Sequence, residues 1–307
     1  MFGIRLFLVK QALHKIKSRA NYHNLRVSRI LFNQKTRKFN QPLAGFTYQT
    51  VEVCGMKSEW IAYNKNNHTN KVILYFHGGG YVTGSIETHR SFCSQLSKHS
   101  GAKLLLIEYR LAPENVYPAP IEDAANAYKW LLAQGYEAKN IAFAGDSAGG
   151  GVTAGTLAYL RDNEIELPAC AVMFSPWLDL TFSGKSYQEN QEIDPMLIYD
   201  GFVLWSKAYL GNAERNAPYA SPLLHSLKKF PPTLIQVGSC EMLLDDSTQF
   251  AAKAKTEGVE VTLEIYDKHF HVFNAFWRVL PQARKANKIA GAFMAKHLNI
   301  SAAKSGE

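Results

Sequence analysis

One serine in this chain stands in a sequence setting that can turn a hydroxyl into a nucleophile. Ser147 lies in Gly145-Asp146-Ser147-Ala148-Gly149, after a strand-like run at 141–144 and before a helix-like stretch at 152–160. A G-x-S-x-G in that setting is typical of a sharp strand-to-helix turn that exposes the hydroxyl. The alternative is a glycine-rich turn without chemistry. The flanking elements favour attack by Ser147 on a carbonyl carbon, with the helix N-terminus favouring the negative charge that develops.

A second glycine-rich stretch offers what such an attack requires. His77, Gly78, Gly79 and Gly80 follow a strand-like run at 72–76. A tetrahedral intermediate carries an oxyanion, which backbone N–H groups without side chains can approach closely. We therefore expect the amides of Gly79, Gly80 and Ala148 to form an oxyanion hole. A phosphate-binding loop is the competing interpretation, but the P-loop lysine is absent.

The elements that must position these residues follow a regular alternation. Apolar, β-rich runs are separated mostly by segments long enough for a crossover helix, which predicts a parallel sheet covered by helices on both faces in one α/β domain. Residues 178–223 interrupt this rhythm. We expect them to form a helical cap together with residues 1–45. The strand-like runs lie at 72–76, 104–109, 141–144, 171–174, 234–237 and 261–265, and shorter strand patterns at 51–53 and 60–62 precede them.

The composition is that of an ordinary globular protein, with 47% apolar and 20% charged residues among 307. The four cysteines, Cys54, Cys93, Cys170 and Cys240, include no C-x-x-C pair. We interpret them as reduced thiols and expect a cytoplasmic protein. No apolar run approaches the length of a membrane span, and the run at 6–9 is too short for a signal-peptide core.

The positive charge is concentrated at the N-terminus. Residues 1–50 hold ten Lys or Arg and no Asp or Glu, which leaves 34 − 10 = 24 basic against 26 acidic residues in the remainder. Leu6, Val9, Leu13 and Ile16 share one helical face, so an amphipathic basic helix is expected. It either docks on the rest of the protein as a cap helix or touches an anionic membrane surface. No recognition motif accompanies the charge, so nucleic acid is not an expected partner.

Five motifs together resemble the bacterial hormone-sensitive-lipase-like family of α/β-hydrolase carboxylesterases. The resemblance covers residues 40–300 and implies an α/β-hydrolase fold with a mostly parallel central sheet and a helical cap, forming one domain over residues 1–307. It implies a serine esterase that hydrolyses short-chain carboxylic esters, small-molecule substrates, through an acyl-enzyme and without a cofactor. No metal motif is present. The motifs, in order, are HGGGYVTGS (77–85), YRLAPENVYPAP (109–120), GDSAGG (145–150), SPWLDL (175–180) and HFHVFN (269–274).

The resemblance also names the partners of Ser147, which follow in the order acid, then histidine. His271 matches the family histidine, and His269 is its rival. Glu241 stands where the family usually has an aspartate. Asp245 is the rival acid, but it and Asp246 open a helical stretch at 247–255, where acidic residues cap a helix and complement its dipole.

Other residues receive supporting roles. In the family, His77 shapes the glycine loop together with Gly78, and we expect Tyr109, Arg110 and Glu114 to brace it. Four aromatic residues line an acyl pocket or belong to the core. A non-catalytic ligand-binding protein on the same scaffold is the alternative function, and a lipid-ester hydrolase at an anionic membrane surface is another. The sequence leaves the oligomeric state undetermined. The four aromatic residues are Trp177, Phe202, Trp205 and Tyr209.

Overall fold

The computed structural model describes residues 2–18, 24–66 and 70–300. An eight-stranded sheet forms the centre of this part of the chain, with the order β1-β2-β4-β3-β5-β6-β7-β8. β2 is antiparallel to both β1 and β4, and the other neighbours are parallel. The strands are β1 (Phe46–Val53), β2 (Met56–Tyr63), β3 (Val72–Phe76), β4 (Lys103–Ile107), β5 (Ile141–Asp146), β6 (Cys170–Phe174), β7 (Thr233–Gly238) and β8 (Val261–Tyr266).

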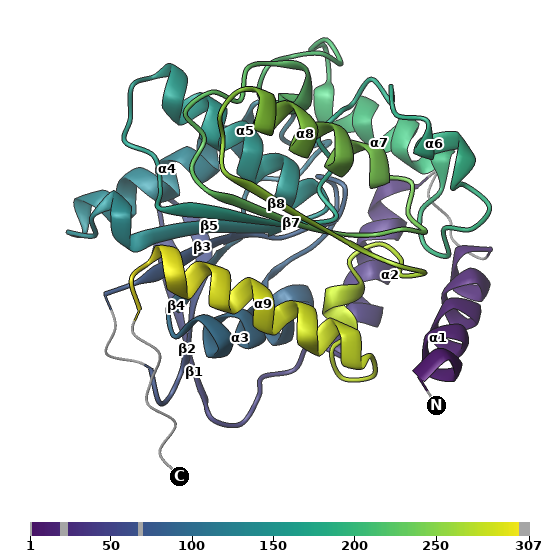
Figure 1. Ribbon diagram of the computed structural model, residues 1–307, viewed down its shortest axis with the longest axis horizontal. Coiled ribbons are helices and arrows are strands. Elements are labelled where there is room, and N and C mark those ends of the chain that lie inside the picture. The colour runs from purple at the N-terminus through teal and green to yellow at the C-terminus, as the bar shows by residue number, and fades with distance from the viewer. Residues whose placement is uncertain (1, 19–23, 67–69, 301–307) are drawn as a thin grey trace.

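Helices cover both faces of this sheet, as Figure 1 shows. Because side chains alternate along a strand, Leu74 and Phe76 of β3 enter one core cluster while Ile73 and Tyr75 enter the other. The first cluster lies under α4 (Ala119–Ala133), α5 (Ala148–Asp162) and α8 (Leu244–Thr256), and the second under α3 (Ile86–Ser100) and α9 (Pro281–His297). The predicted α/β-hydrolase fold is confirmed.

The parallel strands bring the predicted chemistry to one edge of the sheet. β3, β5, β6, β7 and β8 run in the same direction, so the segments that follow them meet at their carboxyl ends. The glycine loop follows β3, Ser147 follows β5, Glu241 follows β7 and His271 follows β8. Residues nearly 200 positions apart in sequence are thereby brought to one place.

Of the two segments predicted to form a cap, residues 1–45 are mainly helical where the structure describes them, and residues 178–223 contain two α-helices separated by turns and loops. Lys17 Nζ joins them by donating to the carbonyls of Gln191 and Asp194, both at 2.8 Å. The longer helix of the second segment begins only at Tyr199, because the Asp194 carboxylate accepts from the amides of Met196 and Leu197 and holds them in a turn. The helices are α1 (Phe2–Lys17), α2 (Leu25–Arg37), α6 (Ser186–Glu189) and α7 (Tyr199–Leu210), and short 3-10 turns elsewhere are η1 (Ala138–Asn140), η2 (Pro222–Leu224) and η3 (Phe273–Phe276).

Candidate functional site

Ser147 occupies a strained turn between β5 and α5. Its backbone has φ 55° and ψ −123°, a conformation that is costly for a residue with a side chain and is characteristic of functional sites. The flanking glycines make the turn possible. A Cβ on Gly145 would collide with the backbone of Gly149, and one on Gly149 would collide with the carbonyl oxygen of Phe76. The spacing of the motif therefore follows from the close packing of α5 against β3 and β5.

A hydrogen-bonded relay links Ser147 to a buried carboxylate. The Oγ of Ser147 lies 2.9 Å from Nε2 of His271, and Nδ1 of the same ring lies 2.8 Å from Oε2 of Glu241. In the neutral imidazole, Nδ1–H donates to Glu241 and Nε2 accepts from the hydroxyl. His271 and Glu241 are buried. The structure thus brings together the three residues predicted as nucleophile, base and acid.

The rival residues are engaged elsewhere. The ring of His269 bonds to the carbonyl of Asp267. The carboxylate of Asp245 accepts from the amide of Ser186, and that of Asp246 accepts from Leu178 and Asp179. The N-cap residue of α8, Leu243, makes no side-chain capping bond, and the first-turn amide of Asp245 donates instead to Oγ of Ser186 at 3.0 Å. Both aspartates lie in the first turn of α8, where their charge complements the helix dipole as expected, but their expected capping role is wrong because their carboxylates hold the segment that follows β6.

The environment of His271 sets its proton affinity. Burial lowers the pKa of the imidazole, but the hydrogen bond and negative charge of Glu241 outweigh burial and leave it above the ordinary value of 6.5. A base with a raised pKa accepts a proton more readily. The relay is therefore suited to removing the proton of Ser147 during attack.

Ser175 supports the acid, and the sequence analysis missed this role. Its Oγ donates to Oε1 of Glu241 at 2.8 Å and accepts from the amide of Val272 at 3.0 Å. The amide of Gly238 donates to the same carboxylate oxygen at 2.6 Å. These bonds fix Glu241 and the loop carrying His271 relative to each other. The available signal was the SPWLDL motif, whose serine directly follows β6.

The glycine loop presents unengaged donors. Gly79 and Gly80 have φ values of 121° and 61°, which lie in the region that glycine tolerates best. Among the described residues, the amides of Gly79, Gly80 and Ala148 donate to no other group. Three N–H groups without internal partners, near a hydroxyl that can attack, have the character of an oxyanion-binding site.

The carboxylate of Asp146 anchors the start of the glycine loop, a role that the sequence analysis did not identify. Its Oδ1 accepts from the amide of Gly78 at 3.0 Å and from the Tyr75 hydroxyl at 2.6 Å. Its other oxygen lies 3.4 Å from Nε2 of His89. The residue preceding the nucleophile thus holds the start of the glycine loop. Its position inside G-x-S-x-G was the only signal for it in the sequence.

His77 is buried beneath the loop. Burial, with the neighbouring His89, lowers its pKa to about 3, so the ring is neutral near pH 7. The ring stacks on Tyr109 with centroids 4.4 Å apart, and the Tyr109 hydroxyl donates to the His77 carbonyl at 2.6 Å. These contacts support a loop-shaping role for His77 with Tyr109 as its brace.

Comparisons with known proteins identify the family of this chain. The family model for the alpha/beta hydrolase fold matches residues 73–275. The chain belongs to this family. It is 39% identical over 244 residues to an acetyl-hydrolase of Streptomyces hygroscopicus, covering 80% of this chain and 81% of the relative. It is 33% identical over 240 residues to an esterase of Acinetobacter venetianus, covering 77% and 78%.

Solved structures place this α/β hydrolase more narrowly. An esterase from the bacterial hormone-sensitive lipase family aligns with a TM-score of 0.91 at 37% identity, covering 96% of this chain and 98% of the other. A crystal of the esterase EstE5 soaked with p-nitrophenyl butyrate gives 0.91 at 39% identity, covering 96% and 99%. The chain is a serine carboxylesterase of the hormone-sensitive-lipase-like type, as its motifs predicted. Neither alternative function, a non-catalytic binding protein or a lipid-ester hydrolase at a membrane surface, is favoured.

Two of the predicted braces of this α/β hydrolase differ from expectation. Arg110 pairs with Asp123 and Glu122, so its assignment to the glycine loop is wrong. Glu114 acts through Arg29 of α2, whose guanidinium also donates to the carbonyls of Val82 and Ala112. Arg110 is held toward α4 because its backbone amide and its guanidinium both donate to the carboxylate of Asp123.

The predicted aromatic residues divide into two groups. Trp177, Phe202 and Tyr209 are buried in the core cluster, and Trp205 is partly buried against it. Trp205 lies on the glycine loop, because a Cβ on Gly80 would collide with its indole ring. Its indole Nε1 is buried without a partner among the described residues. α7 therefore contacts the candidate oxyanion hole through one side chain.

This contact predicts the effect of changing Gly80. Gly80→Ala should lower kcat by about 10²–10³-fold, the loss typical of one oxyanion donor, because the new methyl group must displace Trp205 or the loop. Gly55→Ala is the matched control: Gly55 also has a positive φ, 80°, but nothing lies near its Cβ. Adding Trp205→Ala should restore part of the lost kcat. Steady-state kinetics on p-nitrophenyl acetate measure these kcat values. Equal losses of kcat in Gly80→Ala and Gly55→Ala would refute the effect of the contact between Gly80 and Trp205.

Within the described residues, no group of His, Cys, Asp and Glu is arranged to hold a metal ion. The same residues include no helix long and apolar enough to span a membrane.

Proposed function

We propose that this carboxylesterase hydrolyses short-chain esters through an acyl-enzyme on Ser147, with His271 as general base and Glu241 as the acid that orients it. The observation that carries the proposal is the continuous relay from hydroxyl to imidazole to carboxylate, at 2.9 and 2.8 Å. The unengaged amides of the glycine loop support it. Small-molecule esters are the substrates.

The reaction has two steps, acylation of Ser147 and hydrolysis of the acyl-enzyme. Ser147 Oγ attacks the ester carbonyl carbon while Nε2 of His271 takes the hydroxyl proton. The amides of Gly79, Gly80 and Ala148 stabilise the oxyanion of the tetrahedral intermediate. The intermediate collapses, the ester C–O bond breaks, and His271 gives its proton to the leaving alcohol. A water molecule then repeats the sequence on the acyl-enzyme and releases the carboxylic acid.

Two considerations support a preference for short acyl groups. The chain resembles an acetyl-hydrolase and an esterase whose crystals were soaked with a butyrate ester. The indole of Trp205 lies directly over the glycine loop and limits the space beside it. We expect kcat/KM to peak at acetate or butyrate in a series of p-nitrophenyl esters and to fall for long chains. A maximum at long acyl chains would contradict the preference.

A trapped intermediate tests the covalent step. Rapid acid quenching during turnover of p-nitrophenyl butyrate should leave a butyryl group on the peptide that contains Ser147, detected by mass spectrometry. Ser91→Ala is a matched control, because Ser91 is a buried serine on α3 whose hydroxyl has no hydrogen-bond partner among the described residues. It should retain the adduct. An adduct on another residue, or turnover without one, would remove Ser147 from the mechanism.

The raised pKa of His271 predicts a pH dependence. The base works only when neutral, so kcat/KM should fall as the pH drops through the pKa of His271. Because that pKa lies above 6.5, the midpoint of the acid limb should also lie above pH 6.5. Removing the charge in Glu241→Gln lowers the pKa, so the limb should move to lower pH. An unmoved limb would show that another group governs the profile.

We also propose a cytoplasmic location for the enzyme. The four cysteines are free in the structure, in keeping with a reducing compartment. Cell fractionation with antibodies against the native protein would test this, and recovery from the periplasm or medium would contradict it.

A further inference from the structure

Exposed apolar side chains are concentrated in the two N-terminal helices. Thirteen large hydrophobic residues are exposed in the described part of the chain, and eight of these lie between positions 4 and 39. Scattered single exposures are normal for a folded protein, whereas a concentration of them marks an interaction surface. The eight are Ile4, Phe7, Leu8, Ile16, Val27, Ile30, Leu31 and Phe39.

α1 has two apolar faces with different surroundings. Leu6, with Val9 and Leu13, packs against the cluster around Phe270 on the body of the protein. Ile4, Phe7 and Leu8 recur at i, i+3 and i+4, which places them on one stripe, and they are 62%, 60% and 59% exposed. Of the amphipathic face expected from the sequence, Leu6, Val9 and Leu13 thus dock on the protein while Ile16 is 49% exposed, and a second apolar stripe is left open.

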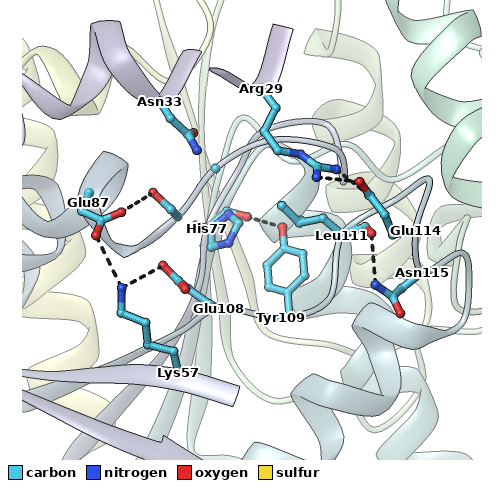
Figure 2. A pocket seen from close by; sticks show the side chains of 12 residues that line it. Arg29, Asn33, Lys57, His77, Glu87, Glu108, Tyr109, Leu111, Glu114 and Asn115 are labelled. Atoms are coloured by element: carbon cyan, nitrogen blue, oxygen red, sulfur yellow. Dashed lines mark hydrogen bonds and ion pairs between the residues drawn. The ribbon is translucent and has the colours of Figure 1, made fainter. Parts of the chain in front are cut away.

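α2 has an apolar stripe on the side turned away from the body. None of its residues is buried. Arg29 and Asn33 line a polar cavity of about 560 Å³ beside the glycine loop, shown in Figure 2 with Glu87 and Glu108 on its far wall. Val27, Ile30 and Leu31 are 37%, 48% and 40% exposed. At 100° per residue, Val27 and Leu31 lie about 120–160° around the helix from Arg29 and Asn33, and Ile30 lies at the edge of that side, about 60° from Asn33. The apolar stripe of α2 therefore faces outward.

The charged side chains of α1, α2 and the residue after α2 are all positive. Residues 1–50 contain no acidic residue. Six exposed Lys or Arg side chains surround the stripes on α1, α2 and the residue after α2, and none of them forms an ion pair with a described residue. Lys17 and Arg29 are used internally. The six exposed cations are Arg5, Lys15, Arg26, Lys35, Arg37 and Lys38.

The exposed apolar stripes and the cations around them indicate which kind of partner binds this surface. A second copy bound through the same surface would bring two sets of cations together, and like charges disfavour that contact. The rest of the chain is close to neutral, with 24 basic and 26 acidic residues outside the first 50. An anionic phospholipid bilayer offers both an apolar interior for Phe7 or Ile30 and negative headgroups for the lysines.

We propose that α1 and α2 form a docking surface for an anionic phospholipid bilayer, with the stripes Ile4-Phe7-Leu8 and Val27-Ile30-Leu31 at the boundary between headgroups and acyl chains. The surface lies beside the candidate active site, because Arg29 joins α2 to the carbonyl of Val82 at 2.7 Å. The protein lies on the membrane through these helices and does not cross it.

Vesicle co-sedimentation of the full-length protein tests this surface. Wild type should bind vesicles of phosphatidylcholine with phosphatidylglycerol and release them at high salt, which screens exposed charges. It should not bind phosphatidylcholine alone. The double change Phe7→Ser and Leu8→Ser should lower the partition coefficient at least about tenfold, given the apolar area lost. Lys35→Glu with Lys38→Glu should have a similar effect.

Matched controls distinguish binding through this surface from non-specific hydrophobic adsorption to vesicles. Ile265→Ser with Val279→Ser removes two exposed apolar side chains elsewhere and should leave partitioning unchanged. Circular dichroism melting verifies that each variant folds. Equal binding to both vesicle types, no binding by wild type, or equal losses in the control would overturn the proposal. A dimer in light scattering that the Phe7 and Leu8 changes dissociate would instead assign the surface to a second copy. Because the readout is sedimentation, it does not depend on the proposed catalytic residues.

Discussion

Replacing Ser147 with alanine should lower kcat for p-nitrophenyl butyrate by about 10⁶-fold, the loss seen when a serine hydrolase loses its nucleophile. The hydroxyl is the atom that forms the acyl bond, and no neighbouring group can replace it. His271 Nε2 loses a partner 2.9 Å away but keeps Glu241. The binding contacts remain, so the residual rate should come from the oxyanion donors alone. Steady-state kinetics with purified protein give the measurement.

The interpretation depends on an intact fold. Ser147→Ala should melt close to the wild-type temperature, because the change removes one oxygen and leaves the strained backbone in place. The Ser91→Ala control should retain full turnover. If Ser147→Ala kept even a hundredth of wild-type kcat, the proposed acyl-enzyme would be wrong, since the chemistry would then have another nucleophile.

The second large effect concerns the acid. Glu241→Gln should lower kcat by about 10⁴-fold, by analogy with the loss caused when the triad carboxylate of a serine protease becomes an amide. An amide can present its NH₂ group to Nδ1 and so favour the wrong tautomer of His271. It also lacks the charge that stabilises the imidazolium. Comparing the kcat values and pH profiles of wild type and variant checks both consequences.

Asp245→Asn is the matched control for the acid. Asp245 lies four residues away, and its carboxylate accepts from the amide of Ser186 at 3.0 Å. We expect a modest loss of stability and a change in kcat of less than about tenfold, because one hydrogen bond outside the relay is typically worth about 1 kcal/mol. A silent Glu241→Gln, or a larger loss in Asp245→Asn, would reverse the assignment.

Losing a contact that only supports Glu241 should lower kcat less than losing Glu241 itself. Ser175 holds one oxygen of Glu241, and Gly238 holds the same oxygen from the backbone. Because the backbone contact survives in Ser175→Ala, Glu241 keeps one of its two supports. The carboxylate is thus fixed redundantly, which explains how a glutamate, with a longer side chain than the usual aspartate, is held in a single orientation.

Sequence patterns within short segments were sufficient to predict the fold and the nucleophile. The alternation of β-rich runs and helical segments predicted the parallel sheet, because each strand must bury both faces under helices. The turn at Ser147 and the glycines around it were predicted because their geometry is set within five residues. The order of the motifs was enough to indicate the family.

Tertiary structure alone decided between close neighbours. His269 and His271 are only two residues apart, so motif spacing alone could not tell which of them is the catalytic base. The turn after β8 directs His271 to Ser147 and His269 to the carbonyl of Asp267. The sequence indicates Asp146 only as part of the G-x-S-x-G motif and Asp246 only as an acidic residue at the start of a helix. They became anchors because the fold brings the amides of Gly78 and Leu178 to them.

The same division applies to the surfaces. The sequence by itself determined that the N-terminal segment is basic and amphipathic, since charge and helical period are properties of consecutive residues. Which face of α1 is covered, and that Trp205 of α7 reaches Gly80, was decided by contacts between segments over a hundred residues apart. Such contacts depend on how the chain closes in three dimensions, and no local pattern encodes that closure.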